Sequence, residues 1–461
     1  MRAPHAVTRL LRTSLALLVC AAPAAAQDRP TGIRVSGEYD VRQRPVIAVR
    51  PFAGASPIAE AIDSITRIVQ RDLHYSDRYN MLDAVPEVLR AGDVDYAQWN
   101  GLRVTYLVTG DVTPTTRGYE LRVTIHDVPW GRVVNDARFA LPAATAPDFR
   151  MAVHAVSDDV VQRTVNAPGI AATRIALTRQ NRTASGTQTY DLLLVDADGF
   201  GLRRIQGFGG QLYSPVWSPD GRRLLYTANR EHGWELIERD IASGRERTIR
   251  PGGEMVSTPT YSRRDGEIAM ALWQGNRNEI TVYDLERQTA RRISAAGRFD
   301  EQYPTYSFDG RWLAFNSTRL GRQAIFVASA DGSNPSAVTP FQAGVKSEYA
   351  APVFSPTDMK LAFHGHWNTS QSLQFQILIA DAARPGSQIT QLTSIGHNED
   401  PSWAPDGRHL VYTATEVRGA PDGLYVVDSE SKIRRLLASG GNMRMADWSP
   451  PLVRASDLVV R

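Results

Sequence analysis

The stretch Trp217-Ser218-Pro219-Asp220-Gly221 (WSPDG) begins a phrase that returns, complete or in part, along the second half of this 461-residue chain. Its aromatic residue recurs at spacings of 44, 45, 48, 49 and 45 residues, and the end of the chain cuts the last copy short. The later copies begin at Tyr261, Tyr306, Phe354, Trp403 and Trp448. A period of about 40 to 50 residues with four short strands per unit is typical of β-propeller blades. The repeat therefore predicts an all-β propeller.

Each repeat is predicted to contain four strands. In the first complete unit, Pro215 to Trp217 begins a strand, the Asp-Gly pair turns the chain, and three more strand-like runs follow at 224–228, 234–240 and 245–249. Glycine accepts a positive φ without steric cost, and aspartate caps the turn through its side chain. Most third strands end in a further aspartate that we expect to cap a turn, at Asp196, Asp240, Asp284, Asp381 and Asp428.

The two ends of the repeat region are incomplete in a complementary way. Residues 173–205 supply three strands without an innermost one, and residues 443–450 supply an innermost strand with nothing after it. Joining them completes a blade and gives six blades in all. This closure removes sheet edges that would otherwise act as templates for aggregation.

Residues 44–168 lack the repeat and are typical of an α/β domain. Residues 45–52 (PVIAVRPF) indicate a buried strand, and apolar residues at helical spacing from Ile58 to Leu73 predict a helix, with Ser56-Pro57 at its start. Residues 106–112 and 119–128 are predicted strands, and residues 149–160 carry the stripe of a last helix. The turn-rich residues 166–169 suggest the boundary, so that the propeller would span 169–461.

Residues 1–26 have the layout of a cleavable export signal. Three arginines precede an apolar run and the Ala24-Ala25-Ala26 cleavage site, and the only cysteine, Cys20, follows Val19 rather than the small residue that lipidation requires. Cleavage would leave residues 27–43 as an N-terminal arm and take the formal net charge from +3 to zero. A polyanion such as nucleic acid is therefore not the expected partner.

Beyond the repeat, several segments match one family. Arg44-Pro45-Val46, residues 72–83 (DLHYSDRYNMLD), residues 108–114 (VTGDVTP), Thr173-Arg174-Ile175-Ala176 and the closing residues 446–450 (ADWSP) together resemble the TolB family of the Tol-Pal envelope system. The resemblance covers essentially the whole chain after the leader. The fifth blade departs from it, with Thr357-Asp358 in place of Asp-Gly and an insertion near residues 367–375.

The resemblance implies a non-enzymatic, monomeric periplasmic scaffold without a cofactor. Such a protein is expected to bind a Pal-like lipoprotein at one mouth of the propeller and a TolA-like inner-membrane partner through its arm, in support of outer-membrane integrity and cell division. Polar residues before the innermost strands should crowd around that mouth, namely Glu301, Gln302, Tyr303, Glu348, Tyr349, Glu399, Asp400 and Arg444. By position, the resemblance adds Met255, Ser257 and Thr258 to the candidate partner-binding residues.

Other functions remain open at this point. The chain has no G-x-S-x-G nucleophile motif, no HExxH and no phosphate loop, which disfavours a hydrolase attached to the propeller. His364 and His366 lie two residues apart and would share a strand face, but two histidines without a third ligand make a weak metal candidate. The alternative function is an exported propeller that binds a small ligand or glycan in its central channel.

Overall fold

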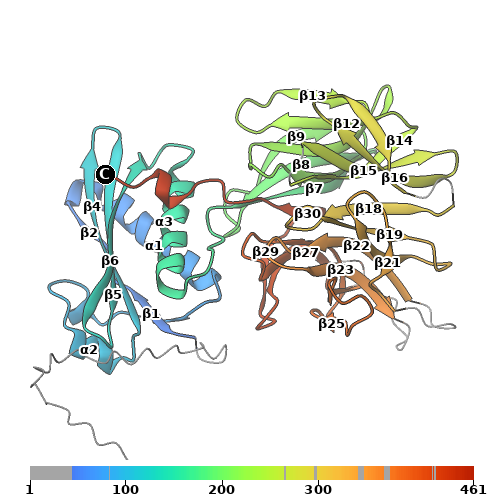
Figure 1. The fold of residues 1–461 in the computed structure, drawn as a ribbon. Helices are drawn as coiled ribbons and strands as arrows, with labels where there is room; N and C mark the ends of the chain where they lie inside the picture. The colour runs from blue at the N-terminus through green and yellow to red at the C-terminus, as the bar shows by residue number, and fades with distance from the viewer. Residues whose placement is uncertain are drawn as a thin grey trace, which may run out of the picture. The chain divides into compact units, whose positions relative to one another are not determined.

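The computed structural model describes residues 44–460, apart from 83, 264–265, 295–297, 341–346, 368–373, 418 and 420–421. The predicted leader and arm, and most of the fifth-blade insertion, lie outside the described residues. Within them, an α/β sheet region is followed by a ring of small antiparallel sheets (Figure 1). The predicted fold class is confirmed.

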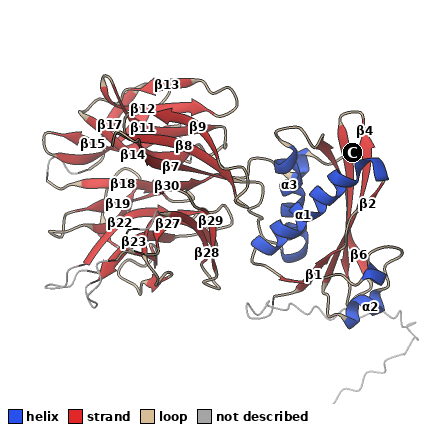
Figure 2. Cartoon of the chain, turned by 180° about the vertical axis from the view of Figure 1, so that it is seen from behind, coloured by secondary structure: helices blue, strands red, loops and turns tan. Residues whose placement is uncertain are grey.

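The α/β region contains one twisted sheet with two long helices (Figure 2). Its strands are β1 (Val46–Val49), β2 (Ala53–Gly54), β3 (Asn80–Met81), β4 (Tyr106–Thr115), β5 (Gly118–Asp127) and β6 (Arg132–Pro142). Its helices are α1 (Ala59–Tyr75), the short α2 (Tyr96–Gly101) and α3 (Phe149–Val165). The sheet order is β3-β1-β4-β5-β6, with β2 on β4; β3, β1 and β4 are parallel, and β4, β5 and β6 are antiparallel.

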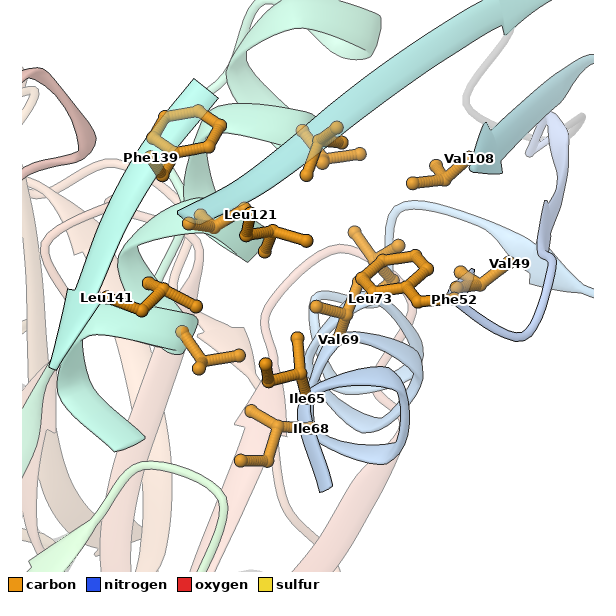
Figure 3. Close-up of a cluster of buried hydrophobic side chains, with 14 of the residues drawn as sticks. Val49, Phe52, Ile65, Ile68, Val69, Leu73, Val108, Leu121, Phe139 and Leu141 are labelled. Carbon is orange, nitrogen blue, oxygen red and sulfur yellow. The ribbon is translucent and has the colours of Figure 1, made fainter. Parts of the chain in front are cut away.

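The core of this region lies between the sheet and the two long helices (Figure 3). Ile65, Val69 and Leu73 of α1 are fully buried against Leu121 of β5 and Phe139 of β6. The predicted helix start is wrong in detail, because Ser56–Ile58 form a separate 3-10 turn without a side-chain cap and α1 begins at Ala59. Strand β6 was missed because its exposed half, with Val133 and Val134, lacks clean alternation.

The propeller consists of six four-stranded sheets among the described residues. Five follow the chain order: β10 (Leu212–Trp217) to β13 (Glu246–Ile249), β14 (Met255–Tyr261) to β17 (Thr289–Arg292), β18 (Glu301–Tyr306) to β21 (Ser336–Ala337), β22 (Ser347–Phe354) to β25 (Thr390–Gln391), and β26 (His397–Trp403) to β29 (Arg434–Ala438). Their middle strands are β11 (Arg223–Arg230), β12 (Gly233–Asp240), β15 (Glu267–Gln274), β16 (Arg277–Asp284), β19 (Trp312–Ser317), β20 (Ala324–Ser329), β23 (Lys360–Trp367), β24 (Gln376–Asp381), β27 (His409–Thr415) and β28 (Gly423–Asp428).

The sixth blade joins the two ends of the repeat, as predicted. Strand β30 (Asn442–Trp448) pairs antiparallel with β7 (Arg174–Arg182), and β8 (Gln188–Asp196) and β9 (Arg203–Phe208) complete the sheet. The indole of Trp448 donates a 2.7 Å hydrogen bond to the hydroxyl of Thr173. The ring is therefore closed by strand pairing and by a buried side-chain contact.

The repeated phrase forms the turn after each innermost strand. In the first copy, the amide of Gly221 (φ +70) donates to the carbonyl of Ser218, and the carboxylate of Asp220 accepts from the amide of Arg222. Four of the aspartates that end third strands also accept backbone amides of their turns: Asp240, Asp284, Asp381 and Asp428. Asp196 instead binds the guanidinium of Arg174 at 2.9 Å.

Candidate partner-binding surface at the channel mouth

Each innermost strand carries one residue in the left-handed backbone region at the same position. The six residues have φ between +45 and +55 and are Ser214, Thr258, Tyr303, Ala351, Asp400 and Met445. At each of them the pairing register with the next strand shifts, which marks a β-bulge. Non-glycine residues in this region cost of order 1 kcal/mol or more each, and such strain gathers at functional sites. A sixfold repeat of it marks this level of the channel as a candidate site.

Near the bulges, the innermost strands of neighbouring blades are connected by individual hydrogen bonds rather than by sheet pairing. At the level of the bulges, the hydroxyl of Thr258 accepts a hydrogen bond from the amide of Tyr303 at 3.1 Å, and the carboxylate of Asp400 accepts one from the amide of Met445 at 3.3 Å. Two residues further along, Asp447 accepts the amide of Trp217 at 2.8 Å. These hydrogen bonds connect three of the six pairs of neighbouring innermost strands and so restrict the movement of the channel wall.

The channel contains two small chambers that adjoin each other. The upper one lies at the level of the bulges, and the lower one lies at the level of the repeated aromatic residues. The upper chamber, about 140 Å³, is lined by the six left-handed residues and the two that follow each. The lower chamber, about 170 Å³, is lined by the repeated aromatic residues and by Arg263. Burial raises the pKa of Asp400 and of Asp447 to about 6, so both carboxyls titrate within the range of mildly acidic solutions.

The structure gathers three of the sequence-predicted residues at the upper chamber. Thr258, Tyr303 and Asp400 line it, and burial raises the pKa of the Tyr303 phenol. Beside them, the guanidinium of Arg444 lies 3.3 Å from the carboxylate of Glu399. The carboxylate of Glu348 is largely exposed, and three further candidates, Met255, Ser257 and Gln302, are half-buried.

The expectation is wrong for Glu301 and Tyr349, which are buried and cannot contact a partner on the rim. Glu301 is fully buried, and its carboxylate accepts hydrogen bonds from Ser317 at 3.0 Å and Arg319 at 2.9 Å. Tyr349 is 3% exposed and packs edge-on against Phe363. Strand alternation turns these residues into the blade, and a short polar stretch before a strand gives no indication of which residue faces inward.

Sequence reasoning missed Ser214, Ala351 and Met445 of the same ring. Ser214 and Ala351 each directly precede a proline that lies two positions before the repeated aromatic residue, as Tyr303 and Asp400 do. Aligning the five repeats that have this proline would have found Ser214 and Ala351. Met445 is followed by Ala446, so it would be found only from its place in the repeat.

The two histidines considered as a metal pair lie beside this mouth on β23. Their rings stack on the ring of Phe375, with centroids at 5.0 Å for His364 and 5.2 Å for His366. Nδ1 of His364 accepts the amide of Asp400 at 3.1 Å, and burial lowers the pKa of His364 to about 4. The imidazole of His364 is therefore neutral and supports the rim residue Asp400.

Among the described residues, the groups with metal-like spacing lie at the opposite end of the blades. Asp77, His409 and Asp428 form one group, and Asp72, His154 and Asp198 form the other. Guanidinium groups already pair with three of the four carboxylates: Arg435 lies 2.8 Å from Asp77, Arg408 2.6 Å from Asp428, and Arg150 2.5 Å from Asp198. The fourth, Asp72, lies 2.8 Å from Nδ1 of His154. We interpret both groups as ion-pair networks between α/β residues and propeller turns.

Comparisons with known proteins agree with the two regions of the fold. Residues 161–452 match the family model described as the TolB beta propeller domain, and residues 33–134 match the TolB amino-terminal domain. The Tol-Pal system protein TolB of Thioalkalivibrio sulfidiphilus is 31% identical over 240 residues, 51% of this chain and 54% of that protein. The TolB of Anaeromyxobacter sp. is 31% identical over 294 residues, 62% of this chain and 64% of that protein. The chain thus spans about half to two thirds of the length of these relatives.

A solved structure shows the same fold. The crystal structure of TolB from Acinetobacter baumannii superimposes with a TM-score of 0.76 at 23% identity, covering 88% of this chain and 97% of that one. None of the described helices is long and apolar enough to cross a membrane.

Proposed function

This chain belongs to the TolB family, and on that basis we propose that it is a non-enzymatic periplasmic scaffold of a Tol-Pal-like system. It binds a peptidoglycan-associated, Pal-like lipoprotein at the propeller mouth and a TolA-like inner-membrane partner through residues 27–43. By linking the two, it supports outer-membrane integrity and cell division. The Tol-Pal names of the relatives support a role in such a system, and the rigid mouth supports the proposed place of lipoprotein binding.

The main support for a lipoprotein-binding site at the mouth is the ring of six strained bulges. A rigid concave surface loses little conformational freedom when a partner binds, so more of the contact energy appears as affinity. Exposed Glu348 and the Glu399–Arg444 pair stand at its rim, where charged groups set the register and the association rate of a partner.

The test is titration calorimetry of the chain from residue 27 onward with the soluble domain of a Pal-like lipoprotein from the same bacterium. The variant Glu348→Gln/Glu399→Gln removes two negative charges of the rim. Glu286→Gln, on the turn before the outermost strand β17, is the control, because Glu286 is exposed like Glu348 and lies away from the innermost strands. We expect at least about tenfold weaker binding (~1.4 kcal/mol) for the rim variant and no change for the control. Equal affinity of all three proteins contradicts this site but leaves the family role.

The proposed role of the arm has a separate test. Removal of residues 27–43 should abolish binding of the periplasmic domain of a TolA-like protein, because the arm supplies the recognised segment. Binding of the lipoprotein domain should persist. Binding of the TolA-like domain to the truncated chain would contradict the role of the arm.

A second candidate function is the binding of a small ligand or glycan in the channel. The two chambers favour it, because polar groups such as Asp447 and Arg263 converge on a partly open space that the repeated aromatic residues line. Such a ligand would raise the melting temperature, and the rise would grow with the ligand concentration. A screen of amino acids, sugars and peptidoglycan fragments that produces no shift would count against this function.

A further inference from the structure

Two large apolar side chains lie exposed on the blade β26–β29, at the end that carries the channel mouth. Ile395, just before β26, is 56% exposed, and Val417, just after β27, is 68% exposed. His397 pairs with Thr415 at the ends of these two strands. A Cβ placed on Gly396 would lie 2.6 Å from the carbonyl oxygen of Thr415, so the two turns are in contact.

The turn that presents Ile395 is held by part-buried side-chain hydrogen bonds. The fully buried amide of Asn398 donates to the carbonyl of Ile395 at 3.0 Å and to the side-chain oxygen of Gln376 at 2.9 Å. Gln376 in turn donates to the carbonyl of Gly396 at 2.8 Å, and Gly396 has φ +76. The buried amide of Asn398 and the half-buried amide of Gln376 thus hold a turn whose largest side chain points into solvent. Such an arrangement fits a preorganised binding element better than an ordinary surface turn.

This apolar pair continues directly into the rim of the mouth. His397, two residues after Ile395, places Nε2 3.3 Å from the carboxylate of Glu399, which also binds Arg444. On the other turn, Glu416 beside Val417 is fixed by Arg434 at 2.6 Å. An apolar centre bordered by charged pairs is the usual anatomy of a protein–protein contact.

We propose that Ile395 and Val417 form an apolar anchor on which the lipoprotein domain of the proposed function docks, so that its footprint extends from the mouth over the blade β26–β29 (orange in Figure 1). The inference rests on the proposed function and adds to it a surface outside the channel. The partner that fits this surface is a folded domain with a complementary apolar patch, because a flexible polar segment in the channel would leave the two side chains exposed.

The test compares two double variants of the same blade by calorimetry with the soluble lipoprotein domain. Ile395→Ser/Val417→Ser removes the anchor. Ile433→Ser/Leu436→Ser is the matched control, because those residues are 48% and 53% exposed and lie at the β28–β29 turn and on the outermost strand. Equal melting temperatures of the variants and the unaltered chain establish that the fold is intact. We expect the dissociation constant to rise at least about tenfold for the anchor variant and less than about twofold for the control.

Each outcome has a distinct meaning. If the unaltered chain binds and the anchor variant binds equally well, this inference is overturned while the proposed function stands. If the unaltered chain does not bind the lipoprotein domain at all, the proposed function fails and the anchor with it. If the unaltered chain dimerises in sedimentation experiments and the anchor variant does not, the surface serves self-association, which also overturns the inference.

Discussion

Replacement of Asp406 by asparagine tests whether one copy of the repeated turn joins the propeller to the α/β region. Asp406 occupies the same position of the phrase as Asp220, but its side chain is 1% exposed. Its carboxylate accepts three hydrogen bonds: one from Nδ1 of His409 at 2.7 Å, and one each from the amides of Arg408 and His409 at 2.9 and 3.0 Å. Nε2 of the same histidine lies 3.1 Å from the carboxylate of Asp77, just after α1. The buried imidazolium thus bridges two carboxylates.

The magnitude follows from the pKa of Asp406. Burial acts to raise this pKa, but the charge and hydrogen bonds of His409 outweigh it and lower the pKa from 3.8 to about 2. This difference corresponds to roughly 2.5 kcal/mol of stability at neutral pH. In Asp406→Asn the charge is lost, and the new NH₂ or the remaining oxygen must face donors on both sides. We therefore expect a loss of about 2 to 4 kcal/mol, which lies between the value from the pKa and the roughly 3 to 5 kcal/mol typical of a broken buried ion pair.

Urea unfolding at pH 7, followed by the fluorescence of the buried Trp217 and Trp403, measures this loss. Asp220→Asn is the control at the same turn position, and it should lose less than about 1 kcal/mol because the Asp220 side chain is 47% exposed. The stability that Asp406 contributes is present above its unfolded pKa of 3.8 and disappears as the pH falls through about 2. The two variants should therefore differ less at pH 2.5 than at pH 7. Equal losses for both variants at pH 7 would refute the reasoning.

Two further predictions concern other buried carboxyls. Gly169→Ala places a Cβ 2.0 Å from the carboxylate of Asp158, which accepts hydrogen bonds from the amides of Ala171 and Ala172 at 2.9 Å each. Because the clash disturbs this contact, limited proteolysis should cut the variant faster at the linker around these residues. An unchanged rate would mean that the contact does not hold the linker. Asp447→Asn removes a carboxyl whose pKa burial raises to about 6. A raised pKa means that the stability contribution is complete below pH 3.8 and is lost as the pH rises through 6, so the melting temperature of the variant relative to the unaltered chain should rise from pH 4.5 to 7.5. A difference that stays constant with pH would contradict this assignment.

The fold could be predicted from sequence because its signals are local and repeated. The period of the aromatic phrase specifies a blade, Asp-Gly turns follow from backbone sterics, and the incomplete first and last units specify closure. Strand β6 was not predicted, and the start of α1 was predicted at the wrong residue. The exposed half of β6 has no alternating pattern, and the helix start depends on how the 3-10 turn at Ser56–Ile58 packs.

The candidate site was likewise predicted only in part. The sequence by itself determined that residues before the innermost strands gather at one mouth, and Thr258, Tyr303 and Asp400 do line it. Only the tertiary structure decided which neighbours face solvent, because strand pairing sets the face to which each side chain points, and Glu301, opposite Ser317, points into the blade. The exposed Ile395 likewise has no local signature, since its rigidity comes from Asn398 and Gln376, a residue on another blade. Periodicity along a chain carries the architecture, whereas exposure at a site is set by contacts between segments that are distant in sequence.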